Sequence, residues 1–344
     1  MFSLHRLIQG AAAAALLATT TLAAQAEGEV NVYTTREPGL IQPLLETFAK
    51  ETGIKANVIF VKEGLAERVA TEGANSPADL LSVVDYGNLI ELVDRGLTQP
   101  VKSEALEAAI PANLRDADGQ WFGLSMRARV IYASKDRVQD ETLTYEDLAD
   151  PRFKGKVCIR SGQHPYNTSL IAAVIAKDGP EATKDWLTGV KANLARKAGG
   201  GDRDVARDIL ANLCDVGIAN SYYVGLMRSG KGGPEQVEWG NAIRVILPTF
   251  KDKAGTHVNV SGAAVAKNAP NKENAVKLLE FLASQQAQEI YAKANFEYPV
   301  RSGVNPDPII AELGTLTVDP LPLTEVAKQR KQASELVDVV GFDD

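Results

Sequence analysis

The order of strand and helix patterns along the chain constrains its fold most. Residues 29–33 alternate polar and apolar side chains as a strand does, apolar residues at helical spacing then run from Leu40 to Phe48, and Gly53 ends that helix. The rhythm repeats, with strands predicted at 54–60 and 78–84 and helices predicted at 63–72 and 89–97. Such alternation predicts an α/β protein with a mainly parallel sheet and helices on both faces.

A long extended run at residues 121–134 interrupts this rhythm, because it carries no helix signal. We interpret it as a crossover from one lobe into a second lobe, and residues 261–266 as a strand that returns to the first. In the second part of the chain we predict strands at 157–160, 216–221 and 243–250 and helices at 167–176, 180–194, 204–213, 271–283, 286–294 and 324–340.

The start of the chain predicts export. A basic start up to Arg6 precedes an apolar, small-residue run at 11–22 and an A-x-A sequence at 24–26, the pattern of a secretory signal peptide. Residues 1–26 are therefore expected to be removed. No later segment offers eighteen uninterrupted apolar residues and no cysteine lies at the cleavage site, so we expect a soluble exported protein without a lipid anchor.

Charge and motif content exclude several functions. The formal net charge is −7 and no basic stripe carries interleaved aromatic residues, so nucleic acid is not an expected partner. Ser221 has no obvious histidine partner and no G-x-S-x-G sequence occurs, so we expect no enzyme.

The two cysteines, Cys158 and Cys214, leave two alternatives open. An exported protein with two cysteines most often joins them in a disulfide, and the other alternative is two buried free thiols. Each cysteine lies eight residues before a tyrosine, Tyr166 and Tyr222 respectively. A bridge between them would tie these two segments together.

Polar clusters follow several of the predicted strands. They are residues 33–37, Arg127, residues 161–167 and the pair Tyr222–Tyr223. Because ligands of open α/β sheets bind beyond the carboxyl ends of the strands, we expect these clusters to converge in a cleft between the lobes.

The adjacent phenols Tyr222 and Tyr223 are the most specific of these clusters. Taken alone, they favour two boundary aromatics, one buried and one exposed, because neighbouring side chains of a strand point to opposite faces. If the chain turns there, they instead present two hard oxygen donors to one cation, and ferric iron is a cation that tyrosinate binds. Only His164 and His257 lie beyond the predicted signal peptide, which disfavours a histidine-rich zinc or copper site.

Beyond these patterns, the chain resembles the periplasmic ferric-ion-binding proteins of ABC-type iron importers over essentially its whole exported length. The stretches that carry the resemblance are residues 30–36 (VNVYTTR), 77–85 (PADLLSVVD), 122–127 (FGLSMR), 153–160 (FKGKVCIR) and 220–223 (NSYY).

The resemblance implies a type II periplasmic-binding-protein fold, the Venus flytrap, with a two-strand hinge. The N-terminal lobe would comprise residues 27–126 plus about 255–290, and the C-terminal lobe residues 127–254 plus about 291–344. It also implies a periplasmic monomer whose partners are a ferric ion, an inner-membrane ABC permease and the ATPase of that permease.

Position by position, the resemblance assigns Fe(III) ligands. Tyr222 and Tyr223 match the tandem phenolates, and Tyr166 matches a third tyrosine ligand of one branch of the family. Arg127 matches an arginine that holds a carbonate-like anion or lines the metal pocket, and the two cysteines match a disulfide of the same branch.

The first loop departs from the family pattern. Where many relatives place histidine, this chain has Glu37, which could supply a carboxylate ligand or act only as an acid at a helix start. Arg36 could line the pocket or form a salt bridge at the sheet end.

Three functional classes follow. The first is a ferric-iron carrier, the second a carrier of the same fold for a small organic cation or oxyanion, and the third a secreted enzyme. A visible phenolate-to-iron absorption that disappears on replacement of a tandem tyrosine separates the first class from the second.

Overall fold

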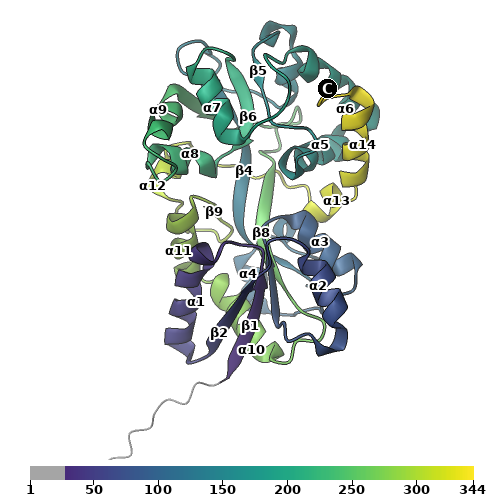
Figure 1. Cartoon of the computed structure of the whole chain (residues 1–344), viewed down its shortest axis with the longest axis vertical. Coiled ribbons are helices and arrows are strands. Elements are labelled where there is room, and N and C mark those ends of the chain that lie inside the picture. The colour runs from purple at the N-terminus through teal and green to yellow at the C-terminus, as the bar shows by residue number, and fades with distance from the viewer. Residues whose placement is uncertain (1–27) are drawn as a thin grey trace, which may run out of the picture.

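The protein consists of two α/β lobes joined by long strands, as seen in a computed structural model that describes residues 28–344 (Figure 1). The predicted signal peptide, residues 1–26, lies outside the described residues. The α/β class and the two-lobed architecture expected above are confirmed.

The first lobe packs helices against a sheet in the order β2-β1-β3-β8-β4. The pairs β1–β2 and β1–β3 are parallel and β3–β8 is antiparallel. Its elements are β1 (Glu29–Thr34), α1 (Pro38–Thr52), β2 (Lys55–Phe60), α2 (Leu65–Glu72), β3 (Leu80–Val83), α3 (Tyr86–Asp94), α4 (Glu104–Ala109), β8 (Val258–Val265), α10 (Lys272–Leu282) and α11 (Gln285–Asn295), with 3-10 turns at Gly73–Asn75 and Ala112–Leu114.

The second lobe has a smaller sheet in which β6 lies between β4 and β5, while β7 pairs with β4. Its elements are β5 (Val157–Cys158), α5 (Pro165–Asp178), α6 (Pro180–Ala192), α7 (Asp202–Leu210), β6 (Val216–Asn220), α8 (Tyr222–Arg228), α9 (Glu235–Ala242), β7 (Ile243–Ile246), α12 (Pro308–Ala311), α13 (Leu323–Ala327) and α14 (Arg330–Val340), with 3-10 turns at Glu146–Ala149 and Pro151–Phe153.

The strand β4 (Phe122–Ser134) links the lobes because it changes partners along its length. Residues up to Ala128 pair with β8, and residues from Arg129 onward pair with β6. The short strand β9 (Tyr298–Pro299) also pairs with β4. The extended crossover predicted at 121–134 is therefore confirmed, and the change of partner falls between Ala128 and Arg129.

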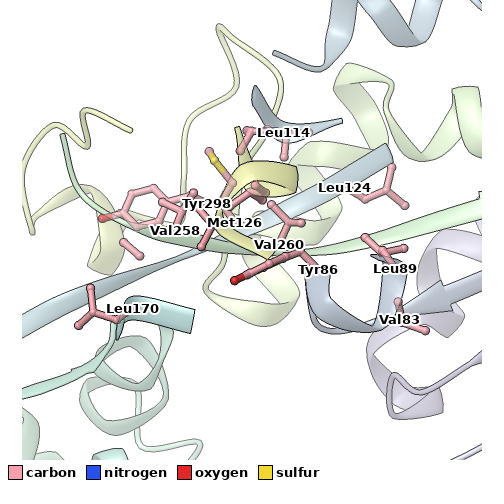
Figure 2. Close-up of a cluster of buried hydrophobic side chains, with 14 of the residues drawn as sticks. Val83, Tyr86, Leu89, Leu114, Leu124, Met126, Leu170, Val258, Val260 and Tyr298 are labelled. Atoms are coloured by element: carbon pink, nitrogen blue, oxygen red, sulfur yellow. The ribbon is translucent and has the colours of Figure 1, made fainter. Parts of the chain in front are cut away.

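Apolar side chains bury both faces of the sheet around this crossover. All 13 residues of β4 are buried, as are all 8 of β8. Figure 2 shows part of this core, in which side chains of the two strands lie beside those of α3 and α5; the labelled residues include Leu124, Met126, Val258, Val260, Tyr86, Leu89 and Leu170. The buried side chains of these strands include charged ones, Arg127 and Arg129 of β4.

Two local expectations have different outcomes. Gly53 ends α1 in the left-handed conformation, with a φ of 72°, as a helix-terminating glycine does. The single helix predicted at 324–340 is instead two helices, α13 and α14. Tertiary packing explains the break, because α13 contacts α3 and α5 whereas α14 packs on α5 and α6.

Cys158 and Cys214 form a disulfide, so the first of the two alternatives is confirmed. The bridge joins β5 to the residues just before β6. Within residues 28–344, no helix combines the length and the apolar character that crossing a bilayer requires.

Candidate metal centre

Three tyrosines from two separate segments meet in the second lobe. Tyr222 and Tyr223 are the first residues of α8, directly after β6, and Tyr166 lies in the first turn of α5. The hydroxyl oxygens of Tyr166 and Tyr222 are 3.5 Å apart, and the ring centroids of Tyr222 and Tyr223 are 4.1 Å apart. All three side chains are half-buried. The strand does end before the pair, so both phenols turn toward the same region.

The end of β6 is fixed by contacts at several atoms of Asn220. Its N–H donates to Asp202 (2.7 Å), its carbonyl accepts from the hydroxyl of Tyr132 (2.9 Å), and its side-chain oxygen accepts from Arg129 (3.0 Å). The next residue, Ser221, is held to Ala128 of β4 by two hydrogen bonds. The backbone that presents the tandem tyrosines is therefore anchored to the crossover strand.

Tyr166 is placed by the start of α5. Pro165 occupies the first position of that helix, where the missing N–H of proline costs nothing. The Nδ1 of His164 accepts a hydrogen bond from the Tyr166 N–H (3.2 Å), and the two rings meet edge to face with centroids 4.6 Å apart. Burial, followed by the charge of Arg160, lowers the pKa of His164 to about 4. The histidine is therefore neutral at neutral pH and can act as this acceptor.

Guanidinium groups surround the tyrosine rings. The central carbons of Arg160, Arg127 and Arg129 lie 5.1, 5.8 and 5.9 Å from the ring centroid of Tyr166. Arg203 lies 5.8 Å from the centroid of Tyr223. At such distances a cation is attracted to an aromatic face, and it also stabilises a negative phenolate oxygen nearby.

The tandem phenols resist ionisation in the absence of a cation. Burial is the first cause that raises the pKa of Tyr222 well above its ordinary value, and the neighbouring phenols of Tyr223 and Tyr166 add to it. Burial also raises the pKa of Tyr223, with Tyr166 as the next cause. Only a strongly charged ion can displace these protons at neutral pH, and such an ion would gain three hard oxygen donors.

Of the two arginines predicted at the site, Arg127 has the contacts that better suit the predicted role of holding an anion or lining the metal pocket. It is 3% exposed and donates to the carbonyl of Val84 and to Asn259 and the carbonyl of Val260 (3.3 and 3.2 Å). Its Nε has no partner among the described residues, and the guanidinium faces Tyr166. The side chain therefore spans from the first lobe to the tyrosines, and its hydrogen bonds within the described residues all come from Nη2.

Within the described residues, neither of the two predicted site residues of the first lobe, Arg36 and Glu37, faces a tyrosine ring of this centre as Arg127 does. Arg36 is buried, and its Nη2 pairs with Glu297 at 3.0 Å and donates to Ser261 at 2.5 Å. Burial acts to lower the pKa of Arg36, but the carboxylate of Glu297 outweighs it together with smaller charges, so the pKa lies above its ordinary value. Glu37 is exposed and its side chain forms no hydrogen bond that caps α1.

Sequence reasoning missed four residues around the tyrosines: Arg129, Arg160, Asp202 and Arg203. Arg129 is 2% exposed and lies 5.9 Å from the ring centroid of Tyr166, and Asp202 is 1% exposed and pairs with both Arg129 and Arg160. Asp202 follows a glycine run, and its one sequence signal is that a carboxylate is favoured at a helix start. Buried ion pairs between residues far apart in the chain produce no spacing pattern in the sequence, so they could not be predicted from it.

Residues 28–344 contain no group of three or more His, Cys, Asp or Glu side chains that is placed to hold a metal ion. A metal at this centre would depend on the phenol oxygens.

Known proteins with a similar sequence carry iron-related names. Residues 75–310 match the profile of a family described as bacterial extracellular solute-binding protein. Iron uptake protein A1 of Synechocystis sp. is 41% identical over 316 residues, which cover 91% of this chain and 87% of that protein. The major ferric iron-binding protein of Neisseria meningitidis serogroup B is 26% identical, with 96% and 98% of the two chains covered.

Solved structures agree with these matches. A Bordetella ferric binding protein superimposes with a TM-score of 0.89 at 63% identity, covering 92% of this chain and 100% of that one. A Trichodesmium protein in complex with iron and citrate superimposes with a TM-score of 0.88 at 41% identity, covering 92% and 100%. The names of these relatives describe iron binding and uptake, which are transport functions and not catalysis.

Proposed function

This chain belongs to the family of bacterial extracellular solute-binding proteins, and we propose that it captures ferric iron in the periplasm and delivers it to an ABC permease. One observation carries the proposal: the hydroxyls of Tyr166 and Tyr222, from segments 56 residues apart, lie 3.5 Å from each other with Tyr223 against them. The shared iron-binding names of relatives at 41% and 63% identity support the same cargo.

The ligand set that we propose consists of the phenolate oxygens of Tyr166, Tyr222 and Tyr223. Three phenolates balance the charge of Fe(III) and are hard donors that disfavour softer ions. The guanidinium of Arg127, with its unused Nε–H, would hold a carbonate-like anion against the metal, or line the pocket if no anion binds. Glu37 and Arg36 are the proposed contributions of the first lobe, Glu37 as a ligand and Arg36 as a pocket residue.

The transport cycle follows from the fold. We place the N-terminal lobe at residues 27–126 plus about 255–290 and the C-terminal lobe at residues 127–254 plus about 291–344, with β4 and β8 as the hinge. Iron enters the open cleft, the lobes close around it, and the loaded monomer docks on the permease, whose ATPase drives uptake. Reduction to Fe(II) would favour release, because phenolates prefer the trivalent ion. The signal peptide would be removed near Ala26 during export.

The test begins with protein purified without added iron. Metal analysis after ferric citrate is supplied should find about one iron per chain, together with a visible phenolate-to-iron band. Tyr222→Phe and Tyr223→Phe should each weaken or abolish that band. Tyr298→Phe is the control, because Tyr298 is a buried tyrosine that is not a proposed ligand and its hydroxyl has no hydrogen-bond partner among the described residues.

Each result has a defined meaning. A colourless protein that binds no iron, or a band that survives both tandem substitutions, contradicts tyrosinate ligation. Binding of a small organic cation or oxyanion in place of iron would establish the second class of carrier, and turnover of a substrate would establish an enzyme.

A further inference from the structure

Asp202 is the buried carboxylate at which the two tyrosine-bearing segments meet. It is the first residue of α7 and 1% exposed. Its Oδ2 accepts from Arg129 (2.6 Å) and from the N–H of Asn220 (2.7 Å), and its Oδ1 accepts from Arg160 (3.2 Å). A carboxylate can accept several such bonds at once, and bonds to charged donors are the strong ones.

The hydrogen-bond partners of Asp202 contact or adjoin both tyrosine-bearing segments, the one with Tyr166 and the one with Tyr222 and Tyr223. Arg129 donates to Asn167 (2.5 Å), the residue after Tyr166, and both Arg129 and Arg160 lie within 6 Å of the Tyr166 ring centroid. Asn220 precedes the tandem pair by two residues at the end of β6. One side chain thus fixes the neighbours of Tyr166 on one side and the backbone leading to Tyr222 on the other.

The negative charge of Asp202 also balances the positive charges of the arginines beside Tyr166. Arg129 and Arg160 bring two positive charges to the Tyr166 ring, and Asp202 is the carboxylate that pairs with both. Without it, two guanidinium groups would face the site unbalanced and would repel an arriving trivalent cation.

We propose that Asp202 is a positioning residue of the metal centre, which holds Tyr166 and the tandem tyrosines at the spacing that one ion requires and balances the arginines around them. The inference rests on the proposed function, since it assumes that the tyrosines bind ferric iron. Asp202 itself does not touch the metal; it acts through Arg129, Arg160 and Asn220. Outer partners of this kind orient metal ligands and tune the bound metal.

Asp202→Asn is the test, and Asp208→Asn is its matched control. Asn keeps the size of the side chain but loses the charge and one acceptor. Asp208 lies on the same helix, is 5% exposed and also accepts from two arginines, Arg196 at 2.7 Å and Arg207 at 3.0 Å. Neither of these arginines stacks on a tyrosine within the described part of the chain. A merely structural role would make the two variants behave alike.

The measurements are the affinity for ferric iron in competition with citrate, the wavelength of the phenolate-to-iron band, and the unfolding midpoint of the iron-free protein. We expect Asp202→Asn to lower the affinity by about 10- to 100-fold, the range for loss of an outer partner, and to shift the band. Asp208→Asn should leave both unchanged even if it lowers the unfolding midpoint equally. Equal effects of the two variants on affinity and band, or an unshifted band in Asp202→Asn, would overturn the proposal.

Arg160→Gln keeps the test decisive if Asp202→Asn does not fold. The Arg160 side chain is 13% exposed, so its replacement disturbs the interior less, and it breaks one of the two ion pairs of Asp202. We expect Arg160→Gln to shift the band relative to the wild type, because it breaks an ion pair of Asp202 and removes a charge beside the Tyr166 ring, and an unshifted band would contradict the proposal. The wild-type protein distinguishes failure of the proposed function from failure of the Asp202 proposal. If the wild type forms no coloured ferric complex, the proposed function fails, and the role of Asp202 fails with it.

Discussion

Replacing Tyr222 with phenylalanine is expected to reduce by one the number of protons released when ferric iron binds. The phenols of Tyr222 and Tyr223 have pKa values raised by burial and by their mutual proximity, so both are protonated in the iron-free protein at neutral pH. Each must lose its proton to become a ligand, because metal ligands bind in the deprotonated form. The affinity of the wild-type protein should therefore rise with pH.

The size of the effect follows from linkage. Every proton released on binding changes the binding free energy by about 1.4 kcal/mol per pH unit, which is tenfold in affinity. With Tyr166 included, the proposed ligand set releases about three protons, and the Tyr222→Phe variant would release about two. The logarithm of the affinity should therefore rise with pH less steeply in the variant than in the wild type, by about one unit per pH unit.

Competition with citrate or nitrilotriacetate between about pH 6.5 and 8.5 measures these slopes. Protons taken up by the chelator are the same for both proteins, so the difference between the slopes belongs to the protein alone. Tyr298→Phe, which removes a buried hydroxyl elsewhere, should keep the wild-type slope. An identical slope for the wild type and the Tyr222→Phe variant would refute phenolate ligation by Tyr222.

Three further predictions concern the framework of the site. Replacing both Cys158 and Cys214 with serine opens a loop with a sequence separation of 56 residues and should lower the free energy of unfolding by about 4 kcal/mol, measured by urea titration with and without reductant. Gly225→Ala places a methyl group where the ring of Phe296 lies, so it should destabilise the protein by about 1–3 kcal/mol, and Phe296→Leu in the same chain should recover part of the loss. Burial lowers the pKa of His257 from 6.5 to about 3, so the unfolded state takes up a proton before the folded state as the pH falls. The free energy of unfolding should fall below about pH 6.5 by up to about 1.4 kcal/mol per pH unit, and His257→Gln should flatten that dependence.

Much of the strand–helix order could be predicted because those elements carry their own local signals, whereas the short helices α4, α8, α9 and α12 were not predicted. Apolar spacing and Gly53 are sufficient to place α1, and the lack of any helix signal is sufficient to identify β4 as extended. The break between α13 and α14 could not be predicted, since it depends on which neighbours each half contacts. Tertiary packing overrides helical spacing at such a point.

Only part of the candidate site could likewise be predicted from the sequence. The tandem pair Tyr222–Tyr223 is visible in the sequence. Its approach to Tyr166, 56 residues away, was expected only in general terms from their positions after strands, and the specific pairing came from the family resemblance. For Arg36 the sequence left a pocket role and a salt bridge open, and it pairs with Glu297 at a sequence separation of 261 residues, which no local pattern could name. Asp202 and Arg129 were missed for the same reason: their roles depend on contacts across the chain.

All three tyrosines lie in one lobe, on α5 and α8, and the disulfide ties together the strands that lead to these helices. Because the three phenol donors lie on one lobe, that lobe could begin to bind the ion while the other lobe is rotated away. The rate of loading would then be governed mainly by the C-terminal lobe, whereas the lifetime of the loaded state would depend on how often the N-terminal lobe, with its own proposed contributions, opens. Cargo uptake and cargo retention would thus be properties of different parts of the chain, open to independent change by mutation.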